Sequence, residues 1–376
     1  MANDIKLNYE DITVVPEVIT NIDSRSECNP YDDDGYLPIF AAPMSSVVSM
    51  ENAKDFNNAF IRCVIPRSYS YNDRVQYLLK NDNNFVAFSL VESRELLIDG
   101  TLKNELPRKT PLKVCIDLAN GHMNSLLELI RKIKDKWGDN VLIMTGNIAN
   151  PETFRYYEET GCDYVRVSIG TGDACTTSSN TAIHYPVFSL LKEIYAIRDE
   201  IGGKCKIIAD GGIKGFGDIQ KALIYADYVM IGSLFNRAIE SAAKTTYGKS
   251  YFNVRGYKIL RPFKTLFTYG KEIPREKFKS AYKLVKSDKL TVWKEYFGQS
   301  TKIAQAIVAS ANSQTLKALK TSEGLFKYQK VEYDLDGWAE NETDFLKSAM
   351  SYTNSRTLDE YKESGWVRIS QRRYNN

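Results

Sequence analysis

Two periodicities of hydrophobic and polar positions alternate along the chain. Eight short runs rich in apolar and β-branched residues occupy positions 38–42, 60–65, 85–90, 112–118, 141–145, 164–169, 206–209 and 228–231. Between several of these runs, as at 123–136 and 188–201, apolar residues recur at the spacing of an amphipathic helix. The alternation of strand and helix predicts a parallel sheet covered by helices.

Eight strand-helix units predict an α/β fold of the (β/α)8 TIM-barrel type, although an open doubly wound sheet fits the same pattern. In a barrel, the loops that follow the strands meet at one end and form the active site. Such loops carry Asp117, Asn147, Cys175, Asp210 and Gly232. We therefore expect residues 1–376 to form a single catalytic barrel domain in which these five residues converge.

The pattern changes after the eighth strand, where an insertion is expected at about 241–295. Residues 250–295 hold twelve basic residues against four acidic ones, interleaved with aromatic side chains. This composition fits an electropositive arm for phosphates or an acidic partner, and equally a solvated insertion that its aromatic residues anchor to the barrel. The following segment, about 299–324, is rich in small and polar residues and predicts a mobile flap, a loop with weak packing over the barrel mouth.

Composition narrows the class of protein. With 376 residues and 43% hydrophobic content, the chain can bury a large core. A net charge of +3 does not indicate a nucleic-acid or membrane surface, and no apolar run approaches the roughly 18 residues that span a bilayer. The N-terminus lacks the basic and apolar segments of a signal peptide, so a cytoplasmic location is expected. Six scattered cysteines without a CxxC pair favour reduced thiols.

One of these cysteines lies in a segment typical of covalent catalysis. Residues 168–177 read SIGTGDACTT and follow an apolar, β-branched run. Gly170 and Gly172 permit a tight turn, and two threonine hydroxyls follow Cys175 directly. The turn predicts an exposed thiol nucleophile with a proton-transfer partner nearby.

The order of motifs resembles the family of inosine monophosphate dehydrogenases and guanosine monophosphate reductases over about 250 residues. The matching segments are YEDITVVP (9–16), SRSE (24–27), PIFAAPM (38–44), DLANG (117–121), TGN (145–147), the cysteine loop (168–177), DGG (210–212), GS (232–233), YFG (296–298), SEG (322–324) and SAMSY (348–352). The basic insertion is not part of the family pattern.

The resemblance implies a purine nucleoside monophosphate as substrate, with Cys175 attacking purine C2. Phosphate is expected at the loops after strands seven and eight, on Gly211, Gly212, Gly232 and Ser233, with a further hydrogen bond from Tyr296. Asp210 would accept hydrogen bonds from the ribose hydroxyls. Further substrate-binding positions are Gly298, Gln299, Ser300, Lys320, Ser322 and Gly324. For the glycines and Asp210, plain turn chemistry is the alternative interpretation.

The resemblance also implies NADPH, potassium and a homotetramer. Backbone carbonyls of Gly170, Gly172 and Cys175, together with Ser178, would hold the monovalent cation. The cofactor-binding positions would be Ser24, Arg25, Arg67, Asp117, Leu118, Ala119, Ile169, Gly170, Ser348, Ala349, Met350 and Ser351.

Two family activities compete, and they need different proton chemistry. The dehydrogenases oxidise IMP to XMP with NAD, and they hydrolyse the covalent intermediate with a mobile Arg-Tyr pair. Between Gly298 and Gly324 the sequence has neither Arg nor Tyr. The reductases instead convert GMP to IMP and ammonia with NADPH, and Thr177 and Glu323 match the positions that protonate the leaving amine. The sequence therefore favours a GMP reductase, although both residues could also be structural.

Three positions depart from the family pattern. Pro43 replaces an Asn of the reductases, and Arg67 replaces a lysine. Asp173 stands where the family has a serine near the substrate phosphate. Its carboxylate would repel the phosphate by several kcal/mol at an effective dielectric near 20, unless a cation from the basic insertion or Lys320 compensates. Alternatively, the substrate is a modified or differently phosphorylated purine.

A third interpretation is a nucleotide-binding or nucleic-acid-binding barrel without catalysis, which would use the basic insertion. The retention of Cys175, Thr177 and Glu323 together argues against it.

Overall fold

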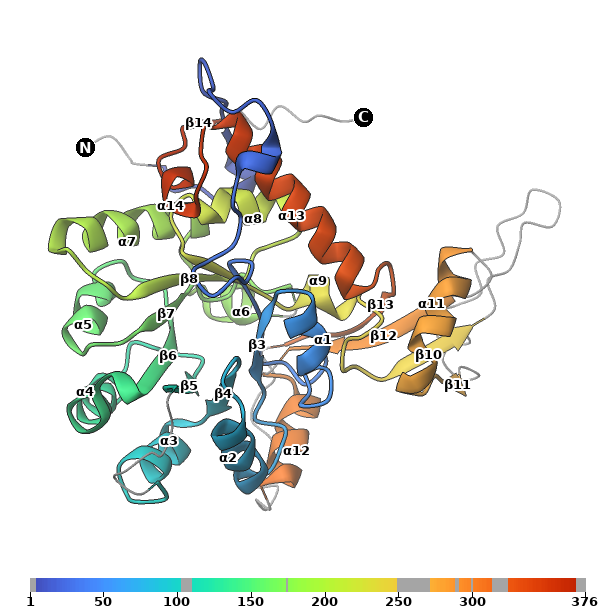
Figure 1. Ribbon diagram of the computed structural model, residues 1–376. Coiled ribbons are helices and arrows are strands. Elements are labelled where there is room, and N and C mark those ends of the chain that lie inside the picture. The colour runs from blue at the N-terminus through green and yellow to red at the C-terminus, as the bar shows by residue number, and fades with distance from the viewer. Residues whose placement is uncertain are drawn as a thin grey trace.

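A closed barrel of eight parallel strands forms the centre of the protein (Figure 1). The computed structural model describes residues 5–102, 110–173, 175–248, 271–287, 291–298, 300–312 and 324–369. The barrel strands are β2 (Ile39–Ala41), β3 (Arg62–Ile65), β4 (Phe85–Phe88), β5 (Leu112–Asp117), β6 (Val141–Ile148), β7 (Tyr164–Val167), β8 (Lys206–Asp210) and β9 (Tyr228–Ile231). All eight predicted strands are present, and the predicted TIM barrel is confirmed.

An outer ring of helices covers the barrel. It contains α1 (Ala53–Asn58), α2 (Tyr71–Lys80), α3 (Leu90–Leu97), α4 (Asn124–Trp137), α5 (Thr153–Glu159), α7 (Val187–Ile201) and α8 (Phe216–Leu223), with the 3-10 turn η3 (Gly138–Asn140) after α4. The sequence explains the helix ends and faces. The side chains of Ser89 and Glu92 cap the start of α3 reciprocally, and α4 buries Leu126, Leu129 and Ile133 at helical spacing.

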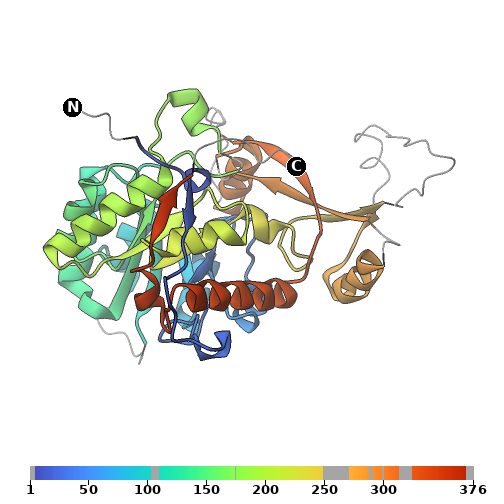
Figure 2. The same ribbon diagram turned by 90° about the horizontal axis from the view of Figure 1, so that it is seen from above.

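A long helix near the C-terminus completes this ring. The helix α13 (Leu335–Tyr352) packs against both α8 and α1, so it takes the place of an eighth barrel helix. Figure 2 shows α13 along the outer wall. The 3-10 turns η1 (Tyr9–Asp11) and η2 (Arg25–Glu27), the short helix α14 (Leu358–Tyr361) and a two-stranded sheet of β1 (Ile12–Val14) and β14 (Trp366–Arg368) bring the two ends of the described chain together.

The predicted insertion forms part of a second, antiparallel sheet with the strand order β11-β10-β12-β13. Its strands are β10 (Thr245–Gly248), β11 (Lys271–Glu272), β12 (Thr291–Phe297) and β13 (Phe326–Lys330), and η4 (Arg275–Lys277) leads into the covering helix α11 (Phe278–Lys286). Aromatic and aliphatic side chains, among them Tyr282 and Val292, form a separate small core there. The sheet projects from one side of the barrel in both views (Figures 1 and 2).

The predicted flap contains a helix. Within 299–324, the described residues 300–312 include α12 (Lys302–Ala311), whose first turn is capped by the Thr301 hydroxyl. The prediction of a loop is wrong for these residues, because a capping threonine followed by helix-forming Ala, Gln and Ile supports a helix even with one buried side chain. Arg74 of α2 donates to Asn312 Oδ1 at 3.1 Å and ties the end of this helix to the barrel.

None of the described helices is both long and apolar enough to cross a bilayer.

Candidate active site

The loop after β7 presents Cys175 at the mouth of the barrel. The Cys175 N–H donates to the Gly172 carbonyl at 2.8 Å, and the Ser178 hydroxyl donates to the Gly170 carbonyl at 2.9 Å. The short helix α6 (Thr177–Thr181) begins two residues after the cysteine. The loop is therefore closed by its own hydrogen bonds, and it holds the thiol next to a helix start.

Cys175 differs from the other five cysteines in exposure. Its side chain is half-buried, whereas the rest are buried in the protein. Burial raises the pKa of the Cys115 thiol to about 12, with smaller opposing effects of Arg166. The Cys175 Sγ lies 3.2 Å from Thr177 Oγ1, within hydrogen-bond distance. The arrangement supplies an accessible thiol with an adjacent hydroxyl.

Gly324 reaches the cysteine loop from the other side. Cys175 and Gly324 form an isolated antiparallel bridge, which joins the loop after β7 to the residue that closes the flap segment. Catalytic candidate Glu323 and substrate-binding candidates Gln299, Lys320 and Ser322 lie outside the described residues. Ser300 and Gly298 are described, and the Gly298 N–H donates to the Leu325 carbonyl at 3.4 Å.

A buried ion network lies beside the cysteine loop. Arg166 of β7 donates from Nη1 to Asp117 Oδ1 and from Nε to Asp210 Oδ2, each at 2.8 Å. Arg67 Nε donates to Asp117 Oδ2 at 3.3 Å. Burial acts to raise the pKa of Asp117, but Arg67 and Arg166 together hold it below its usual value. Both carboxylates at the strand ends are thus fixed in place by guanidinium groups.

Asp210 keeps one oxygen for a ligand. Its Oδ2 accepts from Arg166 and from Asn147 Nδ2, the latter at 2.8 Å. Within the described part of the chain, no hydrogen bond reaches Oδ1. The carboxylate is therefore oriented by one oxygen and open at the other, which suits recognition of a hydroxyl pair.

Glycines after β8 and β9 allow neighbouring segments of the barrel mouth to approach closely. Gly211 has φ of +103°, and a Cβ there would lie 2.6 Å from Thr171 Oγ1 of the cysteine loop. A Cβ on Gly232 would lie 2.7 Å from Met44 Sδ and 3.5 Å from the buried Tyr296 hydroxyl. Burial, with Asp173 nearby, raises the pKa of Tyr296, so the phenol stays a hydrogen-bond donor.

Asp173 has its own partners in this cluster. Its Oδ2 accepts the Ser233 hydroxyl at 2.6 Å, and it forms an ion pair with Lys327 of β13. Burial acts to raise the pKa of Asp173, but the hydrogen bonds from Lys327 and Ser233 lower it. The cation that compensates Asp173 is thus Lys327, while Lys320 lies outside the described residues.

Comparisons with known proteins agree with this geometry. A family model described as "IMP dehydrogenase / GMP reductase domain" matches residues 112–284. A GMP reductase of Streptococcus pyogenes serotype M5 is 31% identical over 290 residues, which cover 70% of this chain and 86% of that protein. A GMP reductase of Aliivibrio fischeri is 28% identical over 270 residues, with coverage of 68% and 77%.

The chain belongs to the IMP dehydrogenase/GMP reductase family. It is therefore an enzyme, and its relatives are oxidoreductases.

The cofactor positions expected for this family fall into two groups in the structure. The first group lies at the barrel mouth. Arg67 and Asp117 belong to the ion network there, and Leu118 and Ala119 follow Asp117 in the sequence. Ile169 and Gly170 belong to the cysteine loop. The other group lies on the outer wall, where Arg25 Nη1 donates to Ser348 Oγ at 3.3 Å. Ser24 belongs to the same turn as Arg25, and Ala349, Met350 and Ser351 follow on α13. Among the described residues, no hydrogen bond or ion pair joins the two groups.

Sequence reasoning missed two residues of the site. Arg166 carries a signal, because a charged residue within the apolar strand 164–167 requires buried partners. The sequence holds no comparable signal for Lys327, since this residue lies on a separate sheet and far along the chain from Asp173. Both are charged partners of carboxylates that the sequence does single out.

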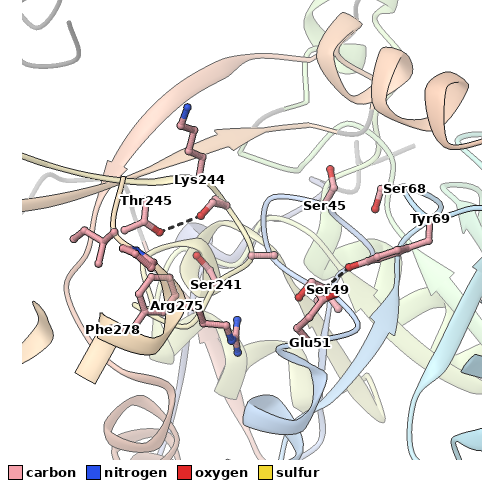
Figure 3. A pocket seen from close by; sticks show the side chains of 15 residues that line it. Ser45, Ser49, Glu51, Ser68, Tyr69, Ser241, Lys244, Thr245, Arg275 and Phe278 are labelled. Carbon is pink, nitrogen blue, oxygen red and sulfur yellow. Dashed lines mark hydrogen bonds between the residues drawn. The ribbon is translucent and has the colours of Figure 1, made fainter. Parts of the chain in front are cut away.

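A polar cavity of about 370 Å³ lies elsewhere, between the barrel and the inserted sheet. Loops after β2 and β3 supply Ser49 and Tyr69, and the insertion supplies Arg275 and Phe278 (Figure 3). Tyr69 donates to Glu51 at 3.0 Å in its wall. Cys175 and the glycine loops do not line this cavity.

Proposed function

We propose that the enzyme is a GMP reductase, which converts GMP and NADPH to IMP, ammonium and NADP⁺ with uptake of two protons. The observation that carries this proposal is the half-buried Cys175 thiol, 3.2 Å from the Thr177 hydroxyl at the barrel mouth. The relatives named GMP reductase support the same reaction.

Cys175 supplies the nucleophile. The thiolate forms a bond to purine C2, the C2–N bond breaks, and the amine leaves as ammonia after protonation. The Thr177 hydroxyl lies beside the sulfur and passes a proton toward the leaving group, with Glu323 as the proposed acid. NADPH, when bound, would supply a hydride to C2, and cleavage of the C2–S bond would release IMP and the free Cys175 thiol.

The rest of the site positions the nucleotide. Asp210 offers its open Oδ1 to the ribose hydroxyls, because Arg166 and Asn147 hold the other oxygen. The backbone around Gly211, Gly212 and Gly232, with Ser233 and Tyr296, receives the phosphate. Gly298, Gln299 and Ser300 read the purine edge, and Gly324 closes over the cysteine loop.

A potassium ion fits the chemistry of the cysteine loop. The carbonyls of Gly170 and Gly172 each accept one hydrogen bond, from Ser178 and from the Cys175 N–H. A carbonyl oxygen has two lone pairs, so each retains one for a cation. With the Cys175 carbonyl and Ser178, these oxygens would hold the ion and stiffen the turn.

Arg67 and Asp117, beside the cysteine loop, suit the nicotinamide end of NADPH. The outer group around Arg25 and Ser348 suits the other end of a dinucleotide bound by a neighbouring subunit, which would require the homotetramer that the family resemblance implies. The predicted cytoplasmic location stays a prediction.

The test is turnover with matched substrates. When the enzyme is given GMP and NADPH, the absorbance of reduced nicotinamide should fall at the rate at which ammonia appears. Cys175→Ala should abolish both the absorbance change and the ammonia release. Cys205 is a buried cysteine directly before β8, and Cys205→Ala should keep the activity. Turnover of IMP with NAD instead would make the enzyme an IMP dehydrogenase and overturn the proposal.

A further inference from the structure

Two hydrogen-bond donors from separate elements converge on one carboxylate oxygen. Asp173 Oδ2 accepts from the Ser233 hydroxyl at 2.6 Å and from the Lys327 ammonium. Gln329 Nε2 donates to Ser233 Oγ at 3.0 Å and fixes the hydroxyl. Lys327 and Gln329 are two residues apart on β13, so they lie on the same face of the strand.

This convergence lies where barrel enzymes hold phosphate. Ser233 lies two residues after the end of β9, the eighth barrel strand, and the loops after strands seven and eight are the usual phosphate site of the fold. The Asp173 and Lys327 side chains are 46% and 36% exposed, so a ligand can reach both. The Ser233 hydroxyl and the Lys327 ammonium thus form a site for an anion, and the Asp173 carboxylate of the same chain occupies it.

We propose that Lys327 supplies the cation of the 5′-phosphate subsite around Ser233, and that Asp173 competes with the phosphate for this cation from within the chain. The inference rests on the proposed function for the identity of the nucleotide. A dianionic phosphate displaces the carboxylate, whereas the neutral 5′-hydroxyl of a nucleoside does not.

Charge decides this competition. A phosphate monoester carries about −1.5 to −2 charges at neutral pH and offers three acceptor oxygens, against one charge on the carboxylate. Asp173 forms an ion pair with Lys327, and the positive charge of Arg237 also acts on Asp173. The subsite is therefore more positive when the carboxylate moves away. The Ser233 hydroxyl has a single proton, so it can donate to the carboxylate or to the phosphate but not to both.

The proposal assigns separate effects to the two charged residues. Without the carboxylate, GMP should bind more tightly, because no internal anion has to be displaced. Without the ammonium, GMP should bind more weakly, because the phosphate loses its cation. Guanosine should respond to neither change, since it carries no phosphate.

The experiment is titration calorimetry of the full chain with GMP and with guanosine, without cofactor. Asp173→Asn and Asp173→Ser should each tighten GMP binding at least tenfold, and Lys327→Met should weaken it at least tenfold, with Lys327→Arg restoring most of the loss. Guanosine binding should stay within twofold throughout. Lys330→Met, the same change at an exposed position of β13, should leave the affinity for GMP unchanged.

Three results would overturn the inference: unchanged GMP affinity in both Asp173 variants, tighter binding of guanosine than of GMP to the native chain, or no binding of either ligand. The proposed function fails separately. If the binding pattern holds but GMP does not oxidise NADPH, the subsite stands and the reaction is wrong.

Discussion

Cys175 and Gly324 lie opposite each other in an antiparallel bridge, although one belongs to the loop after β7 and the other precedes β13. The bridge places the backbone of Gly324 beside the backbone of the residue that carries the thiol. The Cys175 side chain is nevertheless half-buried rather than buried, so chemical modification can report on its accessibility.

Alkylation should distinguish Cys175 from the other five cysteines. Limiting iodoacetamide should label Cys175 first, because the others are buried, and burial raises the pKa of Cys63 and Cys115. Peptide mapping by mass spectrometry measures the order of labelling. GMP should slow the labelling of Cys175 at least fivefold, and equal labelling of a buried cysteine would contradict the expected exposure.

Removal of Arg166 should destabilise the barrel strongly. Arg166→Met leaves Asp117 and Asp210 buried without their shared counter-ion, so we expect a loss of about 3–5 kcal/mol in the free energy of unfolding. Arg166→Lys keeps the charge but loses the two-pronged donor geometry of the guanidinium group. Its free energy of unfolding should lie between those of Arg166→Met and the native protein.

Urea unfolding measures this difference, and Arg155 offers a matched control. Arg155 also pairs with two carboxylates, Glu152 and Glu200, but at the surface of α5. Arg155→Met should change stability little, because surface ion pairs contribute little. Equal effects at the two arginines would show that burial of the Arg166 network does not matter.

Glu240 should make stability depend on pH. Burial, opposed by backbone hydrogen bonds, raises the pKa of Glu240 to about 7, and its Oε2 accepts the Leu335 N–H at 3.1 Å. The negative charges of Asp334 and Asp55 raise the pKa of Glu240 further. Between its ordinary pKa of 4.5 and about 7, the folded chain binds this proton and the unfolded chain does not, so this contribution to stability falls as pH rises through that window.

Glu240→Gln removes that titration. The melting temperature of the variant relative to that of the native protein should rise between pH 5 and pH 8. The reason is that the neutral amide needs no proton and still accepts the Leu335 N–H. Glu340→Gln, at an exposed position on α13, should follow the native pH profile. If the native protein and Glu240→Gln keep a constant difference across this range, the carboxyl group does not titrate there.

Two glycines near β8 should respond to alanine in opposite directions. Gly211→Ala forces φ of +103° on an L-residue and brings Cβ within 2.6 Å of Thr171, so we expect about 1–3 kcal/mol of destabilisation and slower turnover. Gly217 lies in α8 with open space around it, and Gly217→Ala should gain about 0.5–1 kcal/mol. Thermal unfolding of both variants tests these expectations. Unchanged stability of Gly211→Ala would show that Thr171 in the cysteine loop moves to make room for the added Cβ.

The barrel could be predicted from sequence because its strands are buried on both sides and read as continuous apolar runs. Strand ends were less certain: the prediction for β4 extends to residue 90, but the Ser89 cap already starts α3 there. The site was only partly predictable. Cys175 follows its strand in a recognisable turn, whereas the contact of Asp173 with Lys327 depends on how a second sheet folds back.

The inserted sheet has a practical consequence for anyone who trims the protein. Its strands β12 and β13 carry Tyr296 and Lys327 to the barrel mouth, and β12 begins within the basic segment. A shortened chain that ends after β9 would keep the barrel strands and the thiol, yet it would lose Tyr296, Lys327 and the α13 helix that packs against α1 and α8. A minimal fragment should therefore retain β12, β13 and α13.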